Sequence, residues 1–197
     1  QIVKRAIRQA GGVPFEFNTI AVCDGIAMGH TGMKYSLPSR EIVADSVETM
    51  ARAHCFDGLV CIPNCDKVVP GMLMGAARCN IPTIFVTGGQ MRPGKFKGED
   101  IVVFDLANVY RRFQSGQCSP EEFFGKVSSA CPGPGACNVL GTATTMACLT
   151  EVLGMSLPGC ATYIAGEPKG TQLAKDSGRQ ILKLIEQGIK PADILTQ

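Results

Sequence analysis

The 197-residue sequence has no tryptophan, only three tyrosines and nine phenylalanines, and a net charge of just +2. Its lysines and arginines are scattered along the chain, so no basic surface with interleaved aromatic side chains is available to bind nucleic acid. No apolar run approaches the roughly 18 residues that a membrane span needs, and no secretory leader is visible. The sequence therefore predicts a protein that binds neither nucleic acid nor membrane.

Cysteine, by contrast, is abundant, with ten residues. A disulfide framework is typical of small secreted domains, but here 45% of the residues are hydrophobic, enough for a substantial core without cross-links. We therefore expect a reducing compartment, the cytoplasm or an organelle matrix, in which most thiols are buried and a few are ligands. The chain starts at Gln1 without an initiator methionine, and we expect residues 1–197 to form a single domain of a longer polypeptide.

Short β-prone runs alternate with helical patterns along the chain. Strands are expected at 17–22, 58–62 and 82–87. Helices are expected over 2–9, from 39 with Ser39 as the N-cap, from Pro70 to about 80, over 101–113, from 119, from Cys137 to 154, and over 170–187. The stretch around Pro93 is expected to be a loop. This repeated strand–loop–helix order predicts an α/β fold, a three-layer α/β/α arrangement with a largely parallel sheet.

Two carboxylates follow predicted strands. Asp24 ends the first strand, and Asp66 and Lys67 follow the second. Because the carboxyl ends of parallel strands meet at one edge of a sheet, we expect both carboxylates there, in an arrangement that suits Mg²⁺. Asp24 is equally well explained as a turn residue before Gly25, and Lys67 is either a surface lysine, a charge partner or a modified ligand.

The thiols near these carboxylates are candidate metal ligands. Cys65 adjoins Asp66, and Cys137 is expected at a helix N-terminus, where the helix dipole favours a thiolate. Neither cysteine belongs to a paired C-x2-C zinc knuckle. Thiolates from separate loops suit an iron–sulfur cluster, and a buried core thiol is the alternative for each. His30 and Arg40 are further candidates for contact with a substrate.

Four ordered motifs together resemble the dihydroxy-acid and sugar-acid dehydratase family: Asp24–His30, Tyr35–Glu41, Asn64–Met72 and Cys131–Cys137. The match covers essentially the whole chain. The second motif is most similar to its form in dihydroxy-acid dehydratases of branched-chain amino-acid biosynthesis. The alternative within the family is an aldonate or 6-phosphogluconate dehydratase.

The resemblance implies a role for each site residue. Cys65 and Cys137 match ligands of an iron–sulfur cluster, with [2Fe-2S] favoured over [4Fe-4S]. Asp24 and Asp66 match Mg²⁺ ligands, and Lys67 matches a catalytic lysine that becomes carbamylated and binds the same ion. Since carbamylation needs a neutral amine, a lowered Lys67 pKa would be consistent with that role. The implied reaction removes water from a small 2,3-dihydroxy carboxylate to give a 2-oxo acid, in a homodimeric hydro-lyase.

Departures from the family pattern leave other functions open. The family has another cluster cysteine upstream of this chain, and a serine base and a further Mg²⁺ ligand in a C-terminal domain outside it. Residues 138–146 also differ from the usual family sequence, which bears on substrate preference. A cysteine-rich zinc or redox module would explain the ten cysteines but not the group Asp24, Asp66 and Lys67. A regulatory module descended from a dehydratase is the third possibility.

Overall fold

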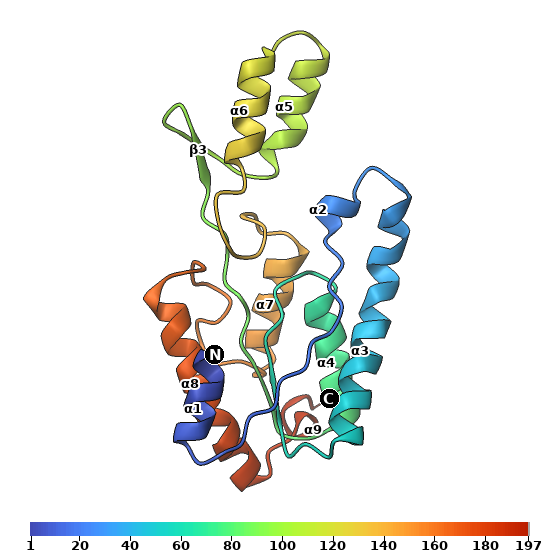
Figure 1. The fold of residues 1–197 in the computed structure, drawn as a ribbon, viewed down its shortest axis with the longest axis vertical. Helices are drawn as coiled ribbons and strands as arrows, with labels where there is room; N and C mark the ends of the chain where they lie inside the picture. Colours follow the sequence, from blue (N-terminus) through green and yellow to red (C-terminus); the bar gives the residue numbers. More distant parts are fainter. Residues whose placement is uncertain (197) are drawn as a thin grey trace.

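The computed structural model describes residues 1–196 and places helices around a small parallel sheet (Figure 1). Strands β1 (Leu59–Cys61) and β2 (Thr83–Phe85) pair in parallel, with Val60 opposite Ile84. Strands β3 (Gly94–Phe96) and β4 (Glu99–Ile101) form an antiparallel hairpin. The helices are α1 (Ile2–Gln9), α2 (Asp24–Ala27), the 3₁₀ helix η1 (Thr31–Tyr35), α3 (Ser36–Ala53), α4 (Val68–Cys79), α5 (Asp105–Gln114), α6 (Pro120–Ser129), α7 (Thr142–Val152), α8 (Pro168–Gln187) and α9 (Pro191–Ile194).

The two faces of the parallel sheet are covered by different helices. Successive side chains of a strand point to opposite faces, so Cys61 and Phe85 pack against α3 and α4 while Val60 and Ile84 pack against α8. Helix α1 lies against α8 on the same side (Figure 1). The predicted α/β class is therefore confirmed, with helices on both faces of a parallel sheet that is small.

Two local predictions are wrong. Residues 17–22 form no strand, and Phe17 instead stacks on Phe56 with ring centroids 6.1 Å apart. The expected loop after Pro93 is the β3–β4 hairpin, which turns at Lys97 and Gly98 with φ of 49° and 91°. Positive φ at both central positions is the geometry of a type I′ hairpin turn.

Close packing of α3 and α4 places their N-terminal ends side by side. A Cβ atom on Gly71 would lie 2.7 Å from the carbonyl oxygen of Arg40, and one on Gly75 would lie 2.9 Å from that of Ala44. Any larger residue at either position would push the helices apart, because real Cβ contacts are longer than this. The two glycines thus allow the approach that builds the site described below.

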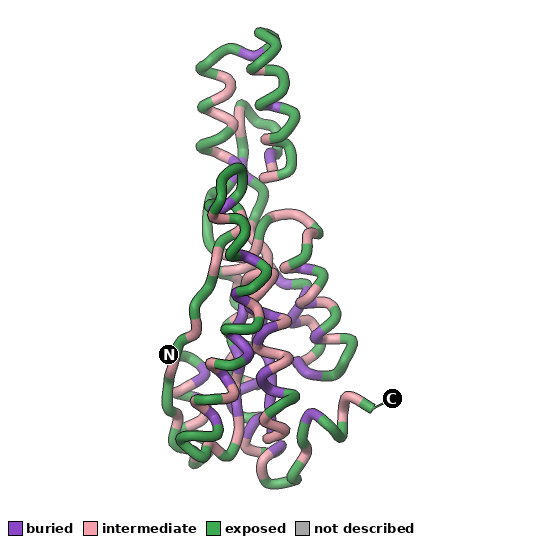
Figure 2. The backbone as a smooth tube through the Cα atoms, turned by 90° about the vertical axis from the view of Figure 1, so that its right-hand side faces the viewer, coloured by how far each residue is buried: buried purple, intermediate pink, exposed green. Residues whose placement is uncertain are grey.

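A lobe made of β3, β4, α5 and α6 projects from the body (Figure 1). Buried residues gather in the body, whereas the lobe is mostly exposed (Figure 2). Its helices are joined by a stack of Phe113 on Phe123, with centroids 4.4 Å apart. The Ser119 hydroxyl accepts a hydrogen bond from the backbone N–H of Glu122 (3.1 Å) and caps α6 as predicted. Within residues 1–196, no helix combines the length and apolarity required to cross a membrane.

Candidate metal-binding site

The segment Cys65-Asp66-Lys67 lies in the loop between β1 and α4. The backbone N–H groups of Val68 and Val69 donate to the carbonyl oxygen of Cys65 (3.1 and 3.0 Å), which closes the first turn of α4. Lys67 is therefore the N-cap residue, and the prediction that the helix begins at Pro70 is wrong by two residues. Pro70 still lies in the first turn, where a missing N–H costs no helical hydrogen bond.

Asp24 meets this segment from a different part of the fold. It is the first residue of α2 and not the end of a strand. The Lys67 Nζ atom lies 3.2 Å from Asp24 Oδ2 and 2.7 Å from Asp66 Oδ2. The side chains of Asp24, Lys67 and Asp66 are 21%, 18% and 14% exposed. The two carboxylates expected at one edge are thus held together by an ammonium group.

The positive charge of Lys67 and the negative charges of Asp24 and Asp66 stabilise one another. Burial lowers the pKa of Lys67, but hydrogen bonds and charge attraction from Asp66 and Asp24 raise it more, so the pKa lies above the ordinary 10.5. Burial likewise raises the pKa of Asp24, but hydrogen bonds from Ser36 and Lys67 bring it below the ordinary 3.8. The lowered pKa that would be consistent with carbamylation is therefore not found for the unmodified Lys67 side chain. Two adjacent carboxylates stabilise its charged form.

Ser36 belongs to the site, although its role was not predicted from the sequence. Its Oγ atom donates a hydrogen bond to Asp24 Oδ1, and the residue is only 1% exposed. Helix α3 begins at Ser36, so the predicted N-cap at Ser39 is wrong, and Ser39 Oγ donates to the Ser36 carbonyl oxygen instead (2.5 Å). A serine at a helix start is normally interpreted as a cap, which conceals a contact of this kind.

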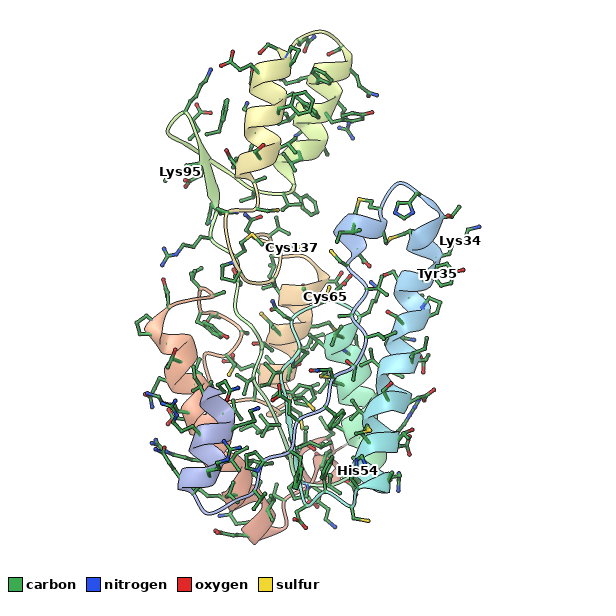
Figure 3. The ribbon with its side chains drawn as sticks, in the orientation of Figure 1. Lys34, Tyr35, His54, Cys65, Lys95 and Cys137 are labelled. Atoms are coloured by element: carbon green, nitrogen blue, oxygen red, sulfur yellow. The ribbon has the colours of Figure 1, made fainter. Side chains whose placement is uncertain are left out.

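Cys65 and Cys137 come from separate loops on the same side of the body, near the base of the lobe (Figure 3). Cys65 Sγ lies 3.5 Å from Asp66 Oδ1, and burial raises the pKa of its thiol to about 11. The predicted helix N-terminus at Cys137 is wrong, because α7 begins at Thr142. Burial raises the Cys137 pKa, and the charges of Cys23 and other nearby acidic groups raise it further. The charge of Cys23 also raises the Cys65 pKa. The sequence did not identify Cys23 as a neighbour of these two thiols.

The other two candidates are engaged locally. The backbone N–H of Gly32 donates to His30 Nδ1 (3.0 Å), so His30 Nε2 carries the proton that it donates to the Ile26 carbonyl oxygen (3.0 Å). The Arg40 guanidinium pairs with Glu41 at 3.0 Å. Among residues 1–196, no three His, Cys, Asp or Glu side chains already converge as a ready metal cage. Lys67, and not a third acidic group, joins the two carboxylates.

Comparison with known proteins identifies the family. The sequence model described as the N-terminal part of dihydroxy-acid/6-phosphogluconate dehydratases matches residues 1–197. This chain belongs to that family. It is 56% identical to the dihydroxy-acid dehydratase of Methanobrevibacter smithii, 58% to that of Methanosphaera stadtmanae and 59% to that of Dehalococcoides mccartyi. Each alignment covers 100% of this chain but 36% of the relative, so the chain spans about a third of the length of these dehydratases.

Proposed function

We propose that this chain carries the metal-binding part of a dihydroxy-acid dehydratase. Such a hydro-lyase removes water from a 2,3-dihydroxy carboxylate to give a 2-oxo acid, here in branched-chain amino-acid biosynthesis. The observation that carries the proposal is the convergence of Asp24, Asp66 and Lys67 beside Cys65. It occurs in a chain 56–59% identical to proteins of that name.

The oxygen donors fit a magnesium ion. Asp24 and Asp66 already direct one oxygen each toward the same positive group, and carboxylate oxygens are the ligands that Mg²⁺ prefers. Asp24 and Asp66 would hold the ion. Carbamylation would convert Lys67 from a cation that competes with Mg²⁺ into an anionic oxygen ligand at the same place. Because the ammonium form does not react with CO₂, this modification first needs the Lys67 proton to leave.

The thiols fit an iron–sulfur cluster, and we favour [2Fe-2S]. Cys65 and Cys137 would hold it, and since burial raises the pKa of both thiols, binding would release their protons. When bound, the cluster supplies a Lewis-acidic iron for the departing hydroxyl, and Mg²⁺ supplies positive charge for the substrate carboxylate. Cys65 and Asp66 are consecutive and in contact, so the chain would keep the two metal centres adjacent.

A sugar-acid dehydratase is the second candidate, because the matching family includes 6-phosphogluconate dehydratases by name. The zinc-module alternative does not explain why Asp24 and Asp66 both face Lys67 beside Cys65. Substrate preference separates the two dehydratases, and metal content separates both from a zinc protein.

The decisive experiment uses the full gene product, purified without oxygen and assayed with dihydroxyisovalerate, 6-phosphogluconate and aldonates. We expect iron, labile sulfide and activity on dihydroxyisovalerate. Asp66→Asn should lower activity by about 100-fold or more. The matched control is Asp45→Asn on α3, whose side chain is 69% exposed and pairs with Arg78, and its activity should be unchanged. Zinc without iron, or activity on sugar acids alone, would overturn the proposal.

A further inference from the structure

We propose that Ser36 is a positioning residue that determines which oxygen of Asp24 faces the cation. This inference rests on the magnesium site proposed above. The two oxygens of Asp24 have different partners. Oδ1 accepts the hydrogen bond from Ser36 Oγ, and Oδ2 faces Lys67 Nζ at 3.2 Å. A carboxylate held at one oxygen by a neutral donor presents the other oxygen to a cation as a single, oriented ligand.

Ser36 is itself firmly held. It is the first residue of α3, it is 1% exposed, and its carbonyl oxygen accepts a hydrogen bond from Ser39. Water has little access to the hydroxyl, so Asp24 has little competition as its acceptor. A buried donor with one charged acceptor makes a stronger hydrogen bond than an exposed one.

The contact also joins two helices through one carboxylate. Ser36 begins α3, and Lys67 is the N-cap of α4. Asp24 bridges them from α2, a helix of only four residues, which by itself gives little rigidity. The close packing of α3 on α4 at Gly71 and Gly75 fixes the separation of the two contacts. The orientation of Asp24 is thus set by rigid neighbours and not by its own segment.

Without the Ser36 hydroxyl, Asp24 is free to rotate about its χ2 angle and to offer either oxygen or both. Outer partners of metal ligands typically contribute 10- to 100-fold to metal affinity. The Ser36→Ala variant should therefore bind a divalent cation at least about 10-fold more weakly. The same variant in an Asp24→Ala background should cause no further loss, because the acceptor oxygens are already absent.

The test measures Mn²⁺ binding to the metal-free full gene product by electron paramagnetic resonance, with no turnover required. Ser46→Ala is the matched control, because it removes a hydroxyl of the same helix that donates to the Ile42 carbonyl oxygen, away from Asp24 and Ser36. We expect weaker Mn²⁺ binding for Ser36→Ala, wild-type binding for Ser46→Ala, and near-wild-type binding for Ser36→Thr, which keeps the hydroxyl. Thermal unfolding should show one cooperative transition for each of the three variants, with the lowest midpoint for Ser36→Ala.

Two results would overturn the inference alone: wild-type Mn²⁺ affinity in Ser36→Ala, or an equal loss in Ser46→Ala. If Ser36→Ala does not fold, weak Mn²⁺ binding by a folded Ser36→Thr variant would also contradict it. A wild-type protein that binds no Mn²⁺ would overturn the proposed magnesium site, and the role of Ser36 with it.

Discussion

Replacing Lys67 by methionine removes the cation between Asp24 and Asp66 while keeping a side chain of similar length. The lost contacts are 3.2 and 2.7 Å long, where a unit charge pair at an effective dielectric of 20 attracts by roughly 4 kcal/mol or more before desolvation. Exposed ion pairs contribute about 0–1 kcal/mol net, and breaking a buried pair costs about 3–5 kcal/mol. At 14–21% side-chain exposure, we expect a loss near 2 kcal/mol in the free energy of unfolding.

The assay is urea unfolding of the full gene product in EDTA, which removes the contribution of bound cations. Lys95→Met is the matched control. Lys95 pairs with Asp100 at 2.6 Å, but the two side chains are 70% and 64% exposed, respectively, so this ion pair should contribute less than about 0.5 kcal/mol to the free energy of unfolding. A double-mutant cycle of Lys67→Met with Asp24→Asn should show coupling of about 1 kcal/mol or more.

The pH dependence follows from the signs of the two pKa shifts. The Lys67 pKa is raised above 10.5, so its contribution is complete below that pH and is lost as pH rises through the folded-state value. The Asp24 pKa is lowered below 3.8, so its contribution is complete above that pH and is lost as pH falls through the folded-state value. The stability difference should therefore be constant between about pH 5 and 9. Equal stability of wild type and Lys67→Met, or an equal loss in Lys95→Met, would refute this account.

Two further predictions concern the core. Burial raises the Cys61 pKa to about 12. At pH 8, iodoacetamide should therefore label the exposed Cys23 in the native protein and should label Cys61 only after unfolding, which mass spectrometry can measure. Equal labelling rates of the two cysteines in the native protein would contradict this prediction. Phe85→Ala should cost about 3–5 kcal/mol of unfolding free energy, because the Phe85 side chain extends from β2 into the core against α3 and α4 and is 0% exposed. Phe104→Ala, at a residue 72% exposed, should change stability by less than about 0.5 kcal/mol, and a similar loss in both would be inconsistent with this core.

Local signals in the sequence were sufficient for several helices. The apolar spacing of residues 2–9 predicted α1, and Ser119 followed by Pro120 predicted the start of α6. Gly188, with φ of 67°, ends α8 as expected. These features are recognisable because caps and helical periodicity involve residues within one or two turns of each other.

Predictions that depended on distant partners were less secure. Residues 17–22 have the composition of a strand but form none, because a strand also needs a paired neighbour. Cys137 lies in a loop and not at a helix start. The Lys67 pKa is raised because Asp66 and Asp24, the latter 43 positions away, both hydrogen-bond its ammonium group, and the strength of that effect depends on the folded geometry.

The sequence by itself determined which metal-binding donor groups the candidate site contains and their order. Cys65, Asp66 and Lys67 are consecutive, so they lie together whatever the conformation of their loop. The sequence also predicted that Asp24 lies near them, but only the tertiary structure decided that it does so from the start of α2 and that Ser36 holds its second oxygen. The physical reason is the approach of α3 to α4 at two glycines. That approach brings together helix ends that are far apart in the chain, and no spacing rule within one segment encodes it.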